Sequence, residues 1–130
     1  MARYFSKFAG VASWRQSSVA NARANKQVRT KIGRIILVPD NVTDTSPFCL
    51  PVQTTGADAF KLALYLISRG LEGMDARIPN TLHDEIIVEA RDAIEDQVKS
   101  IVEESMEAAF KRIIPEVPFA VEIRVAEAWR

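Results

Sequence analysis

The stretch TLHDEIIVEA, residues 81–90, decides the fold, because it joins a strand-forming run to a polar tip. Its three consecutive β-branched residues predict a strand that is covered on both faces. The chain's single histidine, His83, stands just before them, next to two carboxylates, Asp84 and Glu85. Three titratable groups in a row do not suit the interior of a sheet. We therefore predict a β-ribbon over residues 80–90 with these groups at its tip.

The residues that follow the ribbon predict a helix over 92–114 and a strand over 119–126. Asp92 and Glu95 have the spacing of a capping box at the start of the helix. Apolar and polar residues alternate in the strand, as in a half-buried strand of an antiparallel sheet. The apolar stripe of the helix would face the core. It consists of Ile94, Val98, Ile101, Val102, Met106, Phe110 and Ile113.

The residues that precede the ribbon complete an α+β pattern. We predict a helix over 2–25, a β-hairpin over 27–38, a loop over 40–52 and a largely buried helix over 55–69. Gly70 would close the last helix in the left-handed conformation. The order helix, hairpin, helix, hairpin, helix, strand predicts an antiparallel sheet of two hairpins plus a C-terminal strand, packed against helices.

The composition predicts one globular domain over residues 1–130. Hydrophobic residues make up 48% of the chain, which argues against disorder. The single cysteine, Cys49, excludes an internal disulfide and favours a reducing, cytoplasmic setting. No apolar run approaches the ~18–20 residues that cross a bilayer, so we predict no membrane partner.

The charge is zero in total but unevenly distributed. Residues 1–39 contain eight basic residues and no acidic residue. Residues 40–130 contain nine basic and seventeen acidic residues, a net charge of −8. A basic block without opposing acids suits a polyanion such as a nucleic-acid backbone. The alternatives are a solvated surface or a targeting leader, which is also rich in arginine and poor in acids.

Several kinds of functional site can be excluded for the polar tip. The chain has no Gly-rich phosphate loop, and one cysteine with one histidine cannot form a zinc site. It also lacks the G-x-S-x-G elbow of many serine hydrolases. The carboxylates suit a hard metal such as Mg²⁺, which takes one or two of them together with water and phosphate oxygens. The alternative is that His83 and Asp84 are ordinary turn residues.

Five stretches share one known pattern in order and spacing. Residues 4–10 read YFSKFAG, residues 33–40 read GRIILVPD, residues 51–63 read PVQTTGADAFKLA and residues 82–89 read LHDEIIVE. The tail, 106–129, adds M-x-x-A, V-P-x-x-V-E and a terminal tryptophan. Together they resemble the C-terminal part of the palm of family A DNA polymerases, which include bacterial repair polymerases and many phage replicases. The family's last catalytic motif reads V-H-D-E before an apolar strand.

The resemblance implies a role for each residue of the tip. Asp84 matches the family's catalytic aspartate, a ligand of the two Mg²⁺ ions that activate the primer 3′-hydroxyl and neutralise the triphosphate. Glu85 matches an acidic neighbour with a secondary role. His83 matches the histidine that lies near the primer terminus.

The resemblance also implies a DNA-contacting surface. Gln53 matches a glutamine that touches DNA beside the nascent base pair, with a helix cap as the alternative interpretation. Arg34, together with Arg29 and Lys31, lies in a basic hairpin that would face the duplex backbone without reading its sequence. For Asp58, a role at the helix dipole in the first turn is the simpler interpretation.

Three positions depart from the family pattern. The glycine after the glutamine is Thr54, a template-side asparagine is Cys49, and the second arginine of the hairpin is Ile35. Thr54 adds a side chain where the family backbone approaches the DNA closely, and the other two changes remove a template-side group and a cation. We therefore expect weaker DNA binding.

The family's first catalytic aspartate and its nucleotide-binding helix have no counterpart in the sequence. Two-metal chemistry needs carboxylates on both sides of the ion pair. We therefore expect a polymerase piece that is inactive alone and is completed by the missing polymerase portion, in cis or in trans as a split enzyme. The alternative is a non-catalytic DNA-binding or scaffold remnant. The wide apolar arc of helix 55–69, with Leu62, Tyr65 and Leu66, also predicts self-association as a homo-oligomer.

Overall fold

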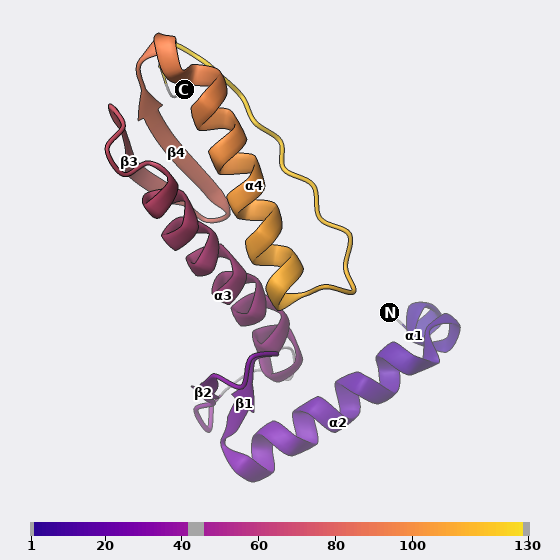
Figure 1. The fold of residues 1–130 in the computed structure, drawn as a ribbon. Helices are drawn as coiled ribbons and strands as arrows, with labels where there is room; N and C mark the ends of the chain where they lie inside the picture. Colours follow the sequence, from indigo (N-terminus) through magenta and orange to yellow (C-terminus); the bar gives the residue numbers. More distant parts are fainter. Residues whose placement is uncertain (1, 42–45, 129–130) are drawn as a thin grey trace. The chain divides into compact units, whose positions relative to one another are not determined.

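The structure, a computed structural model, describes residues 2–41 and 46–128 (Figure 1). The chain folds as two compact units, residues 1–56 and 57–130. Along the chain follow α1 (Ala2–Lys7), α2 (Ala9–Asn25), β1 (Gln27–Arg29), β2 (Ile35–Leu37), α3 (Ser46–Gly70), β3 (Ala76–Leu82), β4 (Glu85–Ala90), the 3₁₀ turn η1 (Asp92–Ile94) and α4 (Glu95–Ile113). The α+β class is confirmed. Within the described ranges, no helix has the length and apolarity to cross a membrane.

The first unit holds the predicted N-terminal helix and hairpin. The predicted helix is interrupted at Phe8, and α2 ends at Lys26 in the left-handed conformation, with φ 54°. Strands β1 and β2 pair antiparallel, and Gly33, with φ +87°, lies in the turn between them. Its small core is aliphatic and consists of Ala22, Val28 and Val38, with Ile36 and Leu50 packed against them.

The second unit has the larger core. Figure 1 shows α4 and the β3–β4 hairpin beside the C-terminal half of α3. Its buried residues are Ala63, Ile67, Leu71, Val98, Met106 and Ala109. All seven residues of the predicted stripe on α4 and its approach are buried or partly buried, so that prediction is confirmed. The hairpin contributes the apolar side chains Ala76, Ile78, Ile86, Val88 and Ala90.

The predicted loop over 40–52 is wrong from Ser46 onward, because α3 already begins there. Residues 42–45 lie outside the described residues. Pro47 suits the first turn of a helix, where its missing N–H costs nothing. Pro51 lies farther inside and removes the helical hydrogen bond that the Pro47 carbonyl would accept. The helix nevertheless continues through Pro51.

Strand β3 is also longer than predicted, because it begins at Ala76, before the predicted start of the ribbon at residue 80. Its pairing with β4 shifts register between Arg77 and Asn80. Pro79 lies in this irregularity, and a bulge is one of the few places where a sheet tolerates proline. The proline therefore marks a bulge and not the end of the strand.

The predicted C-terminal strand over 119–126 is wrong: the segment is extended but pairs with no strand among the described residues. Figure 1 shows it running back along α4. Phe119 stacks on Phe110, with ring centroids 3.8 Å apart and ring planes 8° apart. Phe119 and Val121 pack against the core of the second unit. The alternating pattern therefore predicts burial correctly for Phe119 and Val121, which pack on a helix instead of in a sheet, but not for Ile123 and Val125, which are exposed.

Two helix-end predictions are also wrong. No side chain caps η1 or α4, so Asp92 and Glu95 do not form a capping box; Glu95 instead pairs with Lys99 at 2.6 Å. Gly70 is the last residue of α3 and does not have a positive φ. A Cβ placed on Gly70 would lie 2.5 Å from Cγ2 of Ile101 in α4. The glycine is needed for close approach of the two helices, not for a left-handed turn.

Replacing Gly70 by alanine should therefore destabilise the chain by about 1–3 kcal/mol, although alanine is the better helix former. The methyl group of Ile101 is attached to a branched carbon whose rotamer is fixed in a helix, so it cannot swing away. Urea unfolding measures the change in free energy.

Gly10→Ala is the matched control for this substitution. Gly10 lies in α2, and a Cβ there meets nothing within 4 Å. This variant should be neutral or more stable by up to about 1 kcal/mol. Equal stability changes in the two variants would contradict the close-approach explanation.

Candidate functional site

The polar tip lies where the sequence predicts it. Strands β3 and β4 pair antiparallel up to Leu82 and Glu85, which face each other as the last pair of the ladder. His83 and Asp84 are thus the two-residue loop of a hairpin, and the side chains of His83, Asp84 and Glu85 are exposed. A short loop on a paired ribbon fixes the direction in which it presents its side chains.

His83 has a left-handed backbone conformation, with φ 54°. Two-residue hairpin loops need positive φ because only then does the turn match the twist of the strands. Histidine is one of the few non-glycine residues that are enriched at positive φ. His83 is therefore a turn residue, and this position leaves its imidazole exposed for a further role.

The base of the hairpin is stiffened by charged pairs between the strands. Arg77 and Glu89 are register partners, and the guanidinium donates to both carboxylate oxygens at 2.9–3.1 Å. Next to them, Arg91 pairs with Asp75 at 2.5 Å. Bidentate pairs fix orientation as well as distance. These pairs are exposed and contribute modestly to stability, but they oppose slippage of the register that sets the tip.

The segment after α4 brings a cation near the tip. Arg124 donates to Glu122 through Nε and Nη2 at 2.9 and 2.7 Å. The hydrogen bond and charge of Glu122 raise the pKa of Arg124, and the charge of Glu85 adds to this effect. Glu85 therefore lies within electrostatic reach of Arg124, whereas Asp84 has no ion pair or side-chain hydrogen bond among the described residues.

The tip fits one side of a metal site. Asp84 and Glu85 are adjacent, exposed and carboxylate-bearing, which matches the oxygen ligands that Mg²⁺ prefers. In the part of the chain that the structure describes, no group of three or more His, Cys, Asp or Glu could hold a metal ion. The hairpin can therefore supply one or two carboxylates to a shared site and needs further ligands from elsewhere.

The basic hairpin of the first unit is anchored to α3. Arg34 donates through Nη2 to the Thr54 carbonyl at 3.2 Å, and the backbone N–H of Lys31 donates to the Thr55 hydroxyl at 3.1 Å. The Thr55 hydroxyl in turn donates to the Pro51 carbonyl at 2.6 Å. Arg34 is half-buried and serves as a structural anchor, a role that the sequence did not reveal.

The remaining predicted contact residues lie around this anchor. Arg29 and Lys31 are exposed on the hairpin, and Arg29 donates to the Gly33 carbonyl at 3.2 Å. Gln53 is exposed on α3, well inside the helix, so the cap interpretation is wrong. Asp58 is not in a first turn either: it lies in the middle of α3 and is only 7% exposed.

The decisive comparison is with protein families. A model of DNA polymerase family A matches residues 1–130, the whole chain. The chain belongs to family A of the DNA polymerases. The resemblance seen in the sequence motifs is thereby confirmed.

Curated relatives extend this finding. The family A chain is 35% identical over 131 residues to DNA polymerase I of Aquifex aeolicus, covering 98% of this chain and 22% of that protein. It is 32% identical over 136 residues to the thermostable DNA polymerase I of Thermus aquaticus, with 98% and 16% coverage. The chain thus spans about a fifth of the length of these relatives.

A solved structure has the same arrangement. The POL domain of Pol1 from M. smegmatis, in complex with DNA primer-template and dNTP, matches with a TM-score of 0.73 and 26% identity. The match covers 84% of the family A chain and 21% of that chain. The fold and the sequence therefore point to the same family.

The left-handed position in this polymerase hairpin can be tested by stability. His83→Gly and His83→Asn should leave the free energy of unfolding unchanged or raise it by up to about 1 kcal/mol, because both residues accept positive φ. His83→Val should lower it by about 1–2 kcal/mol, because a β-branched residue is strained there. Denaturant unfolding measures all three variants.

Thr81→Val is the control, since it introduces the same side chain two residues earlier, within β3. It should be tolerated, because strands favour β-branched residues. If valine were equally harmless at both positions, the conformation of the loop would not explain the histidine.

Proposed function

We propose that the chain is the C-terminal palm segment of a template-directed DNA polymerase and that its β3–β4 hairpin carries one catalytic carboxylate. The observation that supports this most directly is the hairpin tip. A rigid ribbon ends in a two-residue loop that exposes Asp84, in the one stretch that matches the family's last catalytic motif. The reaction of the complete enzyme is nucleotidyl transfer to a primer.

In this proposal Asp84 holds Mg²⁺, with Glu85 beside it in a supporting role. Mg²⁺ supplies charge neutralisation at the triphosphate and lowers the pKa of the primer hydroxyl. The exposed tip suits this role, because a metal that must meet a bulky polymer has to be reached from solvent. His83 stands on the same exposed loop, and in this proposal it contacts the primer end. The other ligands come from the missing polymerase portion, in cis or in trans.

In this proposal the exposed residues on and beside the β1–β2 hairpin contact DNA. Arg29 and Lys31 supply positive charge for the phosphate backbone, and Gln53 supplies an amide beside it. Arg34 contributes by holding the hairpin on α3. The substitution of Ile35 for a family arginine removes one cation from this surface, so the binding is weak and depends on the remaining charges.

The isolated chain should not extend a primer, because its described residues supply only part of a metal site. A polymerase assembled from the upstream part of the Aquifex aeolicus relative and this chain should extend one in the presence of Mg²⁺. Asp84→Asn in that assembly should reduce the rate at least a hundredfold, since it removes a metal ligand. Primer extension with all four nucleotides is the assay.

Asp92→Asn is the matched control, because it removes an equally exposed carboxylate outside the tip. It should leave extension unchanged. Activity of the isolated chain that requires Asp84 would show a complete site within this chain. If the assembly extends primers equally well with Asp84→Asn, the chain is instead a non-catalytic, DNA-binding remnant.

Duplex DNA binding by the chain should weaken steeply with salt and should not depend on sequence. The double variant Arg29→Glu with Lys31→Glu should lower the slope of log affinity against log salt by about 2, because each phosphate contact contributes about one counterion. Fluorescence anisotropy at several salt concentrations measures the slope.

Lys111→Glu with Arg112→Glu provides the same change in charge on the last turn of α4. If binding depends only on net charge, both double variants will weaken it equally, and the basic hairpin will have no special role. A loss confined to Arg29 and Lys31 supports the proposed surface.

A further inference from the structure

The aromatic residues of the first unit lie outside its buried core. Residues 1–56 contain five aromatic residues, and none belongs to the aliphatic core cluster of that unit. Large apolar rings normally provide most of the burial in a small unit. Here they gather elsewhere, in a partly exposed cluster built from α1, α2 and the first turns of α3. The cluster consists of Tyr4, Phe5, Phe8, Trp14 and Phe48.

The rings contact one another in two groups. Tyr4 lies 4.9 Å from Phe8 and 5.4 Å from Phe5 between centroids, and Trp14 meets Phe48 edge-on at 5.7 Å. Three of the rings remain open to solvent: Tyr4 is 54%, Phe8 45% and Trp14 41% exposed. The contacts fix the orientation of these rings while their outer faces stay accessible.

Arg15 joins the two groups of rings. Its Cζ lies 5.2 Å from the centroid of Phe5 and 5.4 Å from that of Phe48, so the guanidinium contacts one ring of each group. Lys7 Nζ lies 5.8 Å from the Phe8 centroid. A guanidinium that stacks on rings keeps its in-plane N–H donors available for a planar or phosphate partner. Among the described residues, Arg15 has no ion pair or hydrogen bond of its own.

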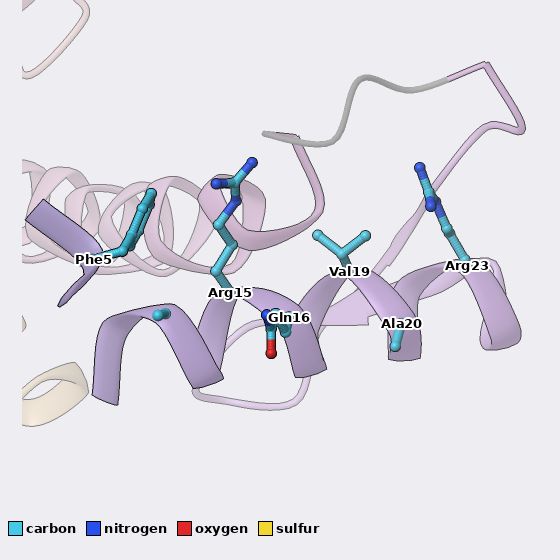
Figure 2. Close-up of a pocket in the computed structure, with 7 residues that line it drawn as sticks. Phe5, Arg15, Gln16, Val19, Ala20 and Arg23 are labelled. Carbon is cyan, nitrogen blue, oxygen red and sulfur yellow. The ribbon is translucent and has the colours of Figure 1, made fainter. Parts of the chain in front are cut away.

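A hollow of about 510 Å³ adjoins this cluster along α2. Figure 2 shows Arg15 and Arg23 extending from the same side of α2, with Val19 between them and Phe5 of α1 beside Arg15. Ala12, Gln16 and Ala20 complete the lining. Small side chains between two arginines leave room for an anionic group beside the rings.

The segment that carries four of the five rings, residues 1–39, has charge of one sign. No acidic residue occurs in residues 1–39, and the first one after them, Asp40, is paired with Lys26. A partner of this surface should therefore be an anion that also offers flat faces to the rings. The bases of a single strand do so, whereas bases inside a duplex are already stacked on each other.

We propose that the aromatic–basic strip, defined as the five rings together with Lys7 and Arg15, binds single-stranded nucleic acid. Unpaired bases stack on the exposed faces of Tyr4, Phe8 and Trp14, and Lys7 and Arg15 meet the phosphates. The class of partner rests on the proposed function, but the strip is separate from the hairpin residues to which that function assigns DNA contact. In a polymerase such a strip would hold an unpaired stretch of DNA.

Trp14 allows this proposal to be tested directly. The chain has two tryptophans, and Trp129→Phe leaves Trp14 as the only indole. Titration of this variant with a twelve-nucleotide oligo-dT should quench its fluorescence to saturation, and added salt should weaken the binding. Stacking on an indole quenches it, whereas a distant phosphate contact does not.

Variants of the full chain, measured by anisotropy of labelled oligo-dT, separate stacking from charge. Trp14→Leu and Phe8→Leu keep an apolar side chain but lose the ring, and each should weaken binding about tenfold. Arg15→Lys keeps the charge but loses the planar stack, and it should weaken binding as well. Tyr65→Leu, which removes an aromatic residue 60% exposed on α3 outside the strip, should leave binding unchanged. Circular dichroism checks that each variant is folded.

Three results would contradict the proposal that the strip binds single-stranded nucleic acid. The first is equal oligo-dT affinity in the wild-type chain and both leucine variants. The second is that the chain binds a twelve-base-pair duplex as tightly as the single strand and that neither leucine variant changes this affinity. The third is quenching of Trp14 by anionic phosphatidylglycerol vesicles but not by oligo-dT, which would mark a lipid-binding surface.

The strip and the proposed polymerase function fail in different ways. If oligo-dT does not quench Trp14 while the assembled polymerase still extends primers in an Asp84-dependent manner, the strip alone is wrong. If quenching and the effect of Trp14→Leu persist while Asp84→Asn leaves extension unchanged, the strip stands and the catalytic assignment of the hairpin is wrong.

Discussion

The burial of one apolar face of the β3–β4 hairpin against α3 and α4 supports everything at its tip. A two-stranded ribbon is marginally stable by itself in water. Here its inward side chains pack against a core in which Ala63, Ile67 and Ala109 are fully buried. The close approach of Gly70 to Ile101 lets the two helices form one continuous surface for the ribbon. Because the ribbon is held in this way, a two-residue loop can present a carboxylate in a fixed direction.

Much of this arrangement could be predicted because it depends on local patterns. The stripe of α4 and the β-ribbon over residues 80–90 follow from periodicity and backbone preference, and both are confirmed. The β-branched run is covered on one face and not on both as predicted, because Ile86 and Val88 pack against the core whereas Ile87 is not among the described residues of that cluster. The errors arise where tertiary packing overrides a local signal. Prolines 47 and 51 look like a loop but lie in a helix, and the alternating tail at 119–126 packs on a helix instead of joining a sheet.

In the candidate site, too, features set by local sequence could be predicted, and features set by tertiary contacts could not. The sequence predicted His83, Asp84 and Glu85 at the tip of a ribbon, and the two-residue loop adds a backbone reason for the histidine that the motif alone could not provide. The anchoring role of Arg34 depends on a carbonyl twenty residues away in the chain, so no local pattern could reveal it. The aromatic–basic strip was hidden for a related reason. Its rings occur at helical spacing and therefore look like core residues until their exposure is known.

The β1–β2 hairpin has a further consequence that concerns how copies of the chain meet. It is a two-stranded sheet, so among the described residues each of its strands has an open edge. Ile35 is 47% and Leu37 78% exposed on this hairpin. Proteins commonly protect such edges with charged side chains, which prevent one sheet from continuing into another. Because the chain has Ile35 where the family pattern has an arginine, one charged residue that would protect this edge is lost. Edge-to-edge pairing of hairpins from different copies should therefore increase with protein concentration.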